Sequence, residues 1–241
     1  MKTIFIDIET EANPDVEDLV KIPSAPSSWK DEKKIAEYAR EKKEEAIEKM
    51  ALDPDYGKIS AISYGFVDDA HALNIRTLIV EKNKIPKSNI YADFFVEKSK
   101  CPILTYSICE SEFFLLRDFF SSDIFSFSGG VFCGFNLLSF DLPYIMRRAM
   151  TLRIPDSKRF LPFDLAKYRT GKVLDLMQIL YNWNTPKSLK WIVKRYHLDN
   201  PLPDLDGSQY ATMDLETRIA YVSNDIYLTW QLYEMMKGYY F

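Results

Sequence analysis

The chain has 241 residues and a formal net charge of −4, with 31 basic and 35 acidic side chains. Its hydrophobic share of 47% and aromatic share of 15% predict a packed globular protein and exclude an intrinsically disordered chain. The acidic balance also excludes a protein that coats nucleic acid through net charge alone. Any nucleic-acid binding must therefore use local basic surfaces or bound cations.

Membrane insertion and disulfide stabilisation are both disfavoured. No apolar run approaches the roughly 18 residues that a membrane-spanning helix needs, so we expect no membrane partner. The three cysteines, Cys101, Cys109 and Cys133, form no CxxC pair, which favours a reduced protein over a disulfide scaffold. Because the first residues enter a strand pattern without a signal peptide, we expect a cytoplasmic location.

The first predicted element is a strand over residues 1–10, rich in β-branched and aromatic residues. Asp7 and Glu9 interrupt its apolar pattern, and side chains two positions apart lie on the same face of a strand, about 7 Å apart. Two like charges on a buried strand are unfavourable unless a cation neutralises them, and divalent metals bind carboxylate oxygens. Alternatively, the strand ends here and both acids reach water.

A charged segment follows the first strand. Residues 13–28 contain Pro, Ser and Asn and predict a loop, whereas residues 30–50 alternate acids and bases without Gly or Pro and predict a helix. This helix is either a solvated element packed along one edge or a lid or arm that binds a protein partner. We therefore expect one domain over residues 1–241 with a charged helical insertion at about 13–55.

The rest of the chain alternates between strand and helix patterns. Residues 59–67 and 73–80 predict an antiparallel hairpin, and residues 85–107 predict a surface excursion with two prolines. Further strands are predicted at 131–136 and 173–179, the latter running into a helix, and helices at 111–120, from 141, at 188–196 and at 213–237. The pattern indicates an α/β fold whose mixed five-stranded sheet carries helices on both faces.

Further acids occur after the fourth predicted strand and near the C-terminus. Asp141 comes five residues after Asn136, in the segment GFNLLSFDLPYI. Tyr221 and Asp225 are four residues apart on a predicted helix and therefore share a face. Each has a simpler interpretation, since aspartate often caps a helix and a tyrosine is often a half-buried core residue.

Taken together, these motifs resemble those of the DEDD 3′–5′ exonucleases, the DnaQ-like group with a ribonuclease H-like fold. The first motif matches at Asp7 and Glu9, the second at Asn136, Phe140 and Asp141, and the third at Tyr221 and Asp225. The histidine branch of the group has its histidine where this chain has Ala220, so the resemblance is to the tyrosine branch. It is closest to stand-alone relatives of the proofreading exonuclease domain of family B DNA polymerases.

The resemblance implies phosphodiester hydrolysis with two divalent cations, Mg²⁺ or Mn²⁺, because an all-oxygen site suits these metals. By this resemblance Asp7 bridges both ions, Glu9 and Asp225 complete the ligands of one, and Asp141 holds the other. Tyr221 orients the attacking water through its hydroxyl and is a poor base, because free tyrosine titrates near pH ~10.

Substrate contacts are expected beside these acids. Thr10, Leu138, Asn136 and Phe140 lie next to acids of the motifs, and Arg147 and Arg148 begin a basic stretch. Residues 147–172 contain eight basic side chains and two acids, and Lys187, Lys190, Lys194 and Arg195 form a second cluster. These clusters are either a track for a nucleic-acid backbone or solvated helix faces. Phe135, Phe140, Tyr144 and Trp183 are candidates either for base stacking or for the core.

The predicted function is a metal-dependent 3′–5′ exonuclease that acts on the 3′ ends of single-stranded nucleic acid, with DNA favoured over RNA. The alternative from another class is a non-catalytic nucleic-acid or partner-binding module on the same fold. A third alternative is an endonuclease, which would also cut circular strands. Four converging carboxylates favour an enzyme, whereas the charged helix at residues 30–50 favours a partner.

Overall fold

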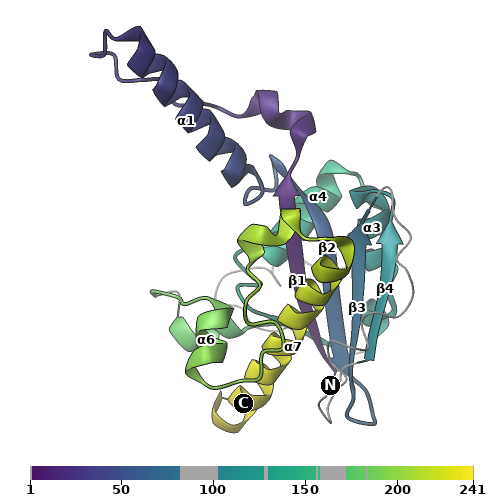
Figure 1. The fold of residues 1–241 in the computed structure, drawn as a ribbon. Helices are drawn as coiled ribbons and strands as arrows, with labels where there is room; N and C mark the ends of the chain where they lie inside the picture. Colours follow the sequence, from purple (N-terminus) through teal and green to yellow (C-terminus); the bar gives the residue numbers. More distant parts are fainter. Residues whose placement is uncertain are drawn as a thin grey trace. The chain divides into compact units, whose positions relative to one another are not determined.

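The chain divides into two compact units. The computed structural model describes residues 2–81, 103–127, 130–155, 157, 172–182 and 184–240 (Figure 1). The first unit comprises Met1–Glu9 and Ser60–Phe241, and the second comprises Thr10–Ile59. The predicted insertion at about 13–55 therefore falls within the second unit.

A six-stranded sheet forms the centre of the fold. Its strands are β1 (Thr3–Ala12), β2 (Gly57–Val67), β3 (Leu73–Val80), β4 (Ile103–Cys109), β5 (Val131–Gly134) and β6 (Val173–Asp175). Their spatial order is β4-β3-β2-β1-β5-β6. β2 and β3 form the predicted antiparallel hairpin, while the β3–β4, β1–β5 and β5–β6 pairs are parallel. The mixed sheet is confirmed, but within the described residues it has six strands and not five.

The additional strand is β4, which the sequence presents as part of a surface excursion at residues 85–107. β4 is an edge strand, and it mixes exposed and half-buried positions, with Ile103 at 51% exposure. Because such a strand lacks a continuous apolar run, its pattern is hard to separate from that of a loop. It pairs with β3 from Asn74↔Ile103 to Val80↔Cys109. Residues 85–102 of the predicted excursion lie outside the described residues.

The described helices of the first unit confirm most of the predicted ones. They are α3 (Glu112–Phe120), α4 (Asp141–Thr151), α5 (Leu176–Tyr181), α6 (Leu189–Arg195) and α7 (Leu215–Tyr240), with short 3₁₀ turns η2 (Asp123–Ser126) and η5 (Gly207–Thr212). Ser188 caps α6 by accepting a hydrogen bond from the Trp191 backbone N–H. None of the helices in the described ranges is long and apolar enough to cross a membrane.

Helices cover both faces of the sheet, as predicted (Figure 1). α7 packs on one face, where Ile226 contacts Gly65 of β2 and Ser223 is hydrogen-bonded to Thr77 of β3. α3 packs on the other face, where the ring of Phe119 meets that of Tyr64. Because side chains alternate along a strand, successive residues of β1 point in turn toward the α7 face and toward the α3 face of the sheet.

The face of β1 toward α7 is set by its odd-numbered residues. Phe5 contacts the Tyr233 ring of α7 at a centroid distance of 5.4 Å. Asp7 and Glu9 follow at two-residue steps and therefore point toward the same helix. The apolar even-numbered positions Ile4 and Ile6 are 0% and 1% exposed, and they anchor the strand in the core.

The second unit contains the charged helix. η1 (Pro14–Leu19) is followed by α1 (Glu32–Met50), so the helix predicted at 30–50 is confirmed. Asp31 caps α1 by accepting hydrogen bonds from the backbone N–H groups of Lys33 and Lys34. Met50 is the only buried residue of α1, as expected for a helix with a thin apolar stripe.

Candidate active site

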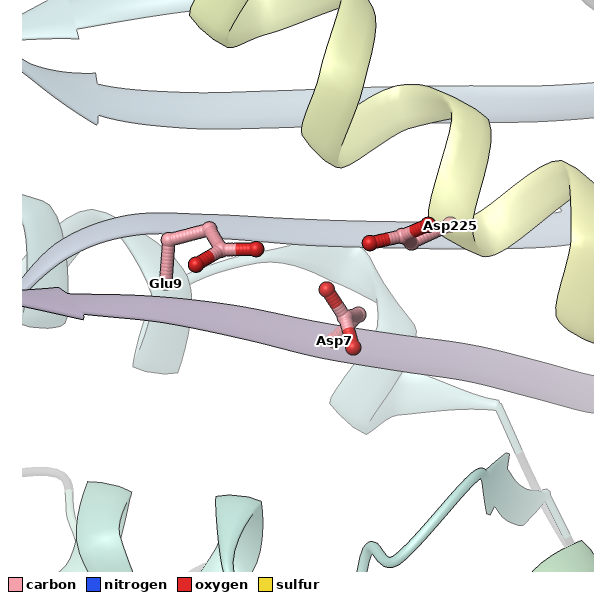
Figure 2. Close-up of side chains that lie close together, drawn as sticks. All are labelled: Asp7, Glu9 and Asp225. Carbon is pink, nitrogen blue, oxygen red and sulfur yellow. The ribbon is translucent and has the colours of Figure 1, made fainter. Parts of the chain in front are cut away.

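Three carboxylates converge between β1 and α7. Asp7 and Glu9 project from β1 toward Asp225, which projects from α7 (Figure 2). One carboxylate oxygen from each residue lies within 4.8 Å of the others. The D-x-E spacing on a strand supplies two of these groups on one face, and packing of α7 on that face supplies the third. The structure therefore brings together the first and third sequence motifs.

One oxygen of the Asp7 carboxylate is unsatisfied within the described part of the chain. The Oδ2 atom of Asp7 is buried and has no hydrogen-bond partner there. Burial raises the pKa of Asp7 well above its usual value, and the neighbouring carboxylates of Asp141 and Asp225 raise it further. Burial likewise raises the pKa of Glu9, with a further contribution from Asp225.

Asp141 approaches β1 from the start of α4, the helix that follows the neighbouring strand β5. It is the first residue of α4, is 4% exposed, and its Oδ1 accepts a hydrogen bond of 3.1 Å from the backbone N–H of Ile8. It therefore lies beside the strand residue between Asp7 and Glu9. Burial raises the pKa of Asp141 to about 7, although the hydrogen bond from Ile8 opposes the shift. Asp141 does not belong to the set of carboxylate oxygens within 4.8 Å.

Tyr221 lies one helical turn before Asp225 on α7 and is hydrogen-bonded to its carboxylate. The tyrosine is 5% exposed, and a Cβ atom added at Gly207 of η5 would lie 3.2 Å from its hydroxyl oxygen. Burial raises the pKa of Tyr221, and the negative charge of Asp225 raises it further. The hydroxyl is therefore protonated at neutral pH and can donate a hydrogen bond.

Lys190 of α6 supplies positive charge to the rim of this group. Its Nζ atom lies 4.8 Å from the centroid of the Tyr221 ring and 3.8 Å from Oδ2 of Asp206. Burial raises the pKa of Asp225 to about 6, and the charge of Lys190 opposes that shift. In the sequence Lys190 appears only as one member of a basic cluster. Its position beside the acids arises from the packing of α6 against α7.

The comparison with family models decides the family. Residues 6–179 match the model described as "DNA polymerase family B, exonuclease domain". The chain belongs to this family. The match begins just before Asp7 and ends within α5. Tyr221 and Asp225 on α7 therefore lie outside the matched segment, and it is the packing of α7 that places them at the site. The predicted resemblance to DEDD exonucleases agrees with this family, whereas the tyrosine branch stays a prediction, because Tyr221 lies outside the matched residues.

Two solved structures match the chain at low sequence identity. The family B DNA polymerase of the archaeon Pyrobaculum calidifontis matches with 15% identity and a TM-score of 0.49, over 98% of this chain and 24% of the polymerase. Exonuclease I with bound product matches with 12% identity and a TM-score of 0.48, over 98% of this chain and 43% of that protein. The chain thus spans less than half of each. No curated protein sequence matches it.

The carboxylate group fits the divalent cations that exonuclease domains of this family generally use. The donor set of Asp7, Glu9 and Asp225 consists of oxygen atoms alone, which suits Mg²⁺ or Mn²⁺. The unpartnered Oδ2 of Asp7 is an available ligand, because a buried carboxylate oxygen ordinarily has a hydrogen-bond partner. The three residues therefore form a suitable binding group for a divalent cation.

The turn of this exonuclease domain between β5 and α4 is held by Asp175, a residue that the sequence motifs do not include. Asp175 accepts hydrogen bonds from the backbone N–H groups of Asn136 and Leu138, at 3.1 and 2.9 Å. Asn136 has a positive φ of 65°, a conformation that asparagine tolerates better than most residues. Asp175 also caps α5, and this local role is the only signal that the sequence offers.

The residues predicted to contact the substrate lie in different parts of the structure. Thr10 belongs to the second unit, where its hydroxyl donates a hydrogen bond to the Ala51 carbonyl. Leu138 is buried, and the Phe140 ring lies 5.4 Å from that of Tyr144. Leu138 and Phe140 both belong to the turn that leads into Asp141. They therefore remain close to the candidate site.

The two arginines of α4 differ from each other. Arg147 is exposed, whereas Arg148 is 5% exposed and forms a paired hydrogen bond with Glu112 of α3 at 2.8 and 2.7 Å. In the structure the Arg148 guanidinium binds the Glu112 carboxylate, and the substrate role predicted for Arg148 stays a prediction. Residues 158–171 of the basic stretch, and Trp183, lie outside the described residues.

Proposed function

We propose that the chain hydrolyses phosphodiester bonds one nucleotide at a time from the 3′ end of single-stranded nucleic acid. The observation that carries this proposal is the convergence of Asp7, Glu9 and Asp225 within 4.8 Å, with an unpartnered oxygen on Asp7. Membership of the family B exonuclease domains supports it. We expect DNA to be preferred over RNA, because the matched family comes from DNA polymerases.

The four acids would hold two divalent cations, Mg²⁺ or Mn²⁺. Asp7 would contribute to both, Glu9 and Asp225 to one, and Asp141 to the other. When bound, such cations lower the pKa of a coordinated water and neutralise charge on the leaving oxygen. Asp7 is suited to a shared position because one of its oxygens has no protein donor among the described residues.

Tyr221 would position the attacking water. Its hydroxyl is held next to Asp225, and its raised pKa keeps the proton on the oxygen. Such a group can orient a water molecule but cannot deprotonate it efficiently. Lys190 would limit the accumulated negative charge beside Glu9 and Asp225, because it opposes the pKa shifts of both. Phe140 and Leu138 would contact the terminal nucleotide.

A 5′-labelled 20-nucleotide strand tests the proposed function. With Mg²⁺ or Mn²⁺ the wild-type protein should shorten it from the 3′ end in a ladder. Asp7→Ala and Asp225→Ala should each reduce the rate about 10³-fold or more, because each removes a cation ligand worth several kcal/mol in the transition state. Asp69→Ala, an exposed acid in the β2–β3 turn, is the matched control and should leave the rate unchanged.

Two outcomes would contradict the proposal. Absence of degradation with either cation would favour a non-catalytic binding module on the same fold. Cleavage of a circular single strand would favour an endonuclease, because an exonuclease has no end at which to begin. Parallel assays with matched DNA and RNA strands test the expected preference, since a contact to the 2′-hydroxyl distinguishes the two.

The second unit supports a separate proposal, which concerns a partner. The exposed charges of α1, residues 32–50, would bind another protein, as predicted for residues 30–50. Lys42 pairs with Glu45 within the helix, and Lys43 pairs with Glu17 of η1 at 3.0 Å. Such pairs contribute little stability at an exposed surface, so they remain available for exchange with a partner. A cytoplasmic location remains a prediction.

A further inference from the structure

The exposed side of α6 combines basic and aromatic residues. Ile192 and Val193 are 0% and 2% exposed and fix the helix to the core that includes Leu228 of α7. The opposite side of the helix presents Trp191, which is 46% exposed. A single exposed aromatic residue is ordinary on a protein surface, so Trp191 is informative only through the charges around it.

Basic residues surround this tryptophan. The Lys187 Nζ atom lies 5.8 Å from the centroid of the Trp191 ring. Lys194 is exposed and lies three residues after Trp191, so both belong to one helix face. Residues 176–198 contain three lysines and one arginine but no acid, although the whole chain has a net charge of −4. The face therefore attracts a polyanion.

The same helix reaches the candidate active site. Lys190 directly precedes Trp191 in the helix, with its Nζ atom 4.8 Å from the Tyr221 ring centroid, and it also approaches Asp206. One side of α6 thus contacts the residues beside the carboxylates, while Lys187, Trp191 and Lys194 continue outward. We call these three residues the α6 face. A strand whose 3′ end reaches Asp225 could pass along this face.

We propose that the α6 face binds the single-stranded substrate upstream of the bond that is cleaved. Trp191 stacks on a base, and Lys187 and Lys194 contact backbone phosphates. Stacking requires an exposed aromatic ring and tolerates any base, which suits an enzyme that moves along a strand. This inference rests on the proposed function and extends it from the reacting end to the nucleotides behind it.

The test compares a long and a short substrate. Trp191→Ala should raise KM for a 20-nucleotide thymidine strand about 5- to 100-fold, the range expected for losing one base stack. The kcat/KM for the dinucleotide dTpdT should stay unchanged, because that substrate ends before the α6 face. Trp191→Phe should restore most of the loss. Tyr239→Ala is the control, since Tyr239 is 84% exposed near the end of α7 and should have no effect.

A binding measurement keeps the test independent of catalysis. Fluorescence anisotropy of a labelled 20-nucleotide thymidine strand in EDTA should show weaker binding by Trp191→Ala than by the wild type. Lys194→Ala should reduce the slope of log affinity against log salt concentration by about 0.7, as expected for one lost phosphate contact. Thermal unfolding of each variant, with the wild-type midpoint expected, verifies that the helix is intact.

Failure of the inference is distinguishable from failure of the proposed function. If the wild type hydrolyses both substrates and Trp191→Ala changes neither KM nor binding, the α6 face is not the substrate track. An equal loss on the dinucleotide and the long strand would also overturn the inference, because it would indicate a disturbed site. If the wild type hydrolyses neither substrate, the proposed function fails, and the anisotropy result alone decides whether the face binds single strands.

Discussion

Two groups of buried or half-buried charged side chains in the first unit differ in whether a cation accompanies the carboxylate. Glu112 and Arg148 join α3 to α4, with side chains that are 10% and 6% exposed and two hydrogen bonds between them. In the part of the chain that the structure describes, Asp7, Glu9 and Asp225 lie close together, Oδ2 of Asp7 has no hydrogen-bond partner, and Lys190 approaches from the rim. Both groups lose hydration on folding, and of the two the first has a cation that binds its carboxylate through two hydrogen bonds.

This difference separates a structural role from a functional one. The Glu112–Arg148 pair neutralises its own charge, so it connects two helices. In the carboxylate group, folding brings like charges together and raises the pKa of each member, which costs stability in the absence of a bound cation. Such destabilising charge clusters are typical of functional sites, where the unpartnered atoms can bind a ligand.

The largest effect is expected from breaking the structural pair. Arg148→Met should lower the free energy of unfolding by about 3–5 kcal/mol, because Glu112 would remain buried without its partner. Urea denaturation measures the change. The double variant Glu112→Leu with Arg148→Met should regain much of the loss, since it removes the unpaired charge. A loss below about 1 kcal/mol in the single variant, typical of exposed pairs, would contradict the structural role.

Removing one charge from the cluster of Asp7, Glu9 and Asp225 should change the free energy of unfolding in the opposite direction. In EDTA, Asp225→Asn should raise the free energy of unfolding by about 1–3 kcal/mol, because it relieves desolvation of a carboxylate whose pKa is raised to about 6. The exposed acid Asp69 provides the control variant Asp69→Asn, which should be neutral. A clear loss of stability in Asp225→Asn would show that the carboxylates are satisfied without added cations.

The smallest effect is a pH dependence of the metal-free protein. In the folded state the pKa is raised from the ordinary aspartate value of 3.8 to about 6 for Asp225 and to about 7 for Asp141. Between about pH 4 and pH 7 the folded state therefore binds more protons than the unfolded state. The titration of these groups lowers the free energy of unfolding as the pH rises.

Thermal unfolding in EDTA at several pH values measures this dependence. The midpoint of the wild type should fall relative to that of Asp225→Asn as the pH rises from 4.5 to about 7, because the variant lacks one of the titrating groups. Mn²⁺ should stabilise the wild type more at pH 8 than at pH 5. A constant difference between wild type and variant would contradict the assignment of raised pKa values to this group.

Much of the candidate site could be predicted because it depends on local periodicity. Alternation along β1 places Asp7 and Glu9 on one face, and the helical repeat places Tyr221 and Asp225 together. The helix at Asp141 could be placed from its proline in the first turn. These relations involve neighbours within one element, which a single sequence displays directly.

The rest depends on contacts between elements that are distant in the chain. The Arg148 guanidinium binds Glu112, which lies 36 residues earlier in the chain. Asp175 holds the turn at Asn136 from another strand, and Lys190 reaches Tyr221 only through helix packing. The edge strand β4 has no continuous apolar run to mark it. No local pattern encodes these pairings.

The central claim is that the three carboxylates form a binding group for divalent cations. Crystals soaked in Mn²⁺ and measured at its absorption edge test this most directly. We expect an anomalous peak bonded to Asp7, within about 2.0–2.3 Å of its oxygen atoms, together with Glu9 or Asp225, and no peak in Asp7→Asn crystals. An enzyme that is active in Mn²⁺ but shows no peak at these residues would contradict it.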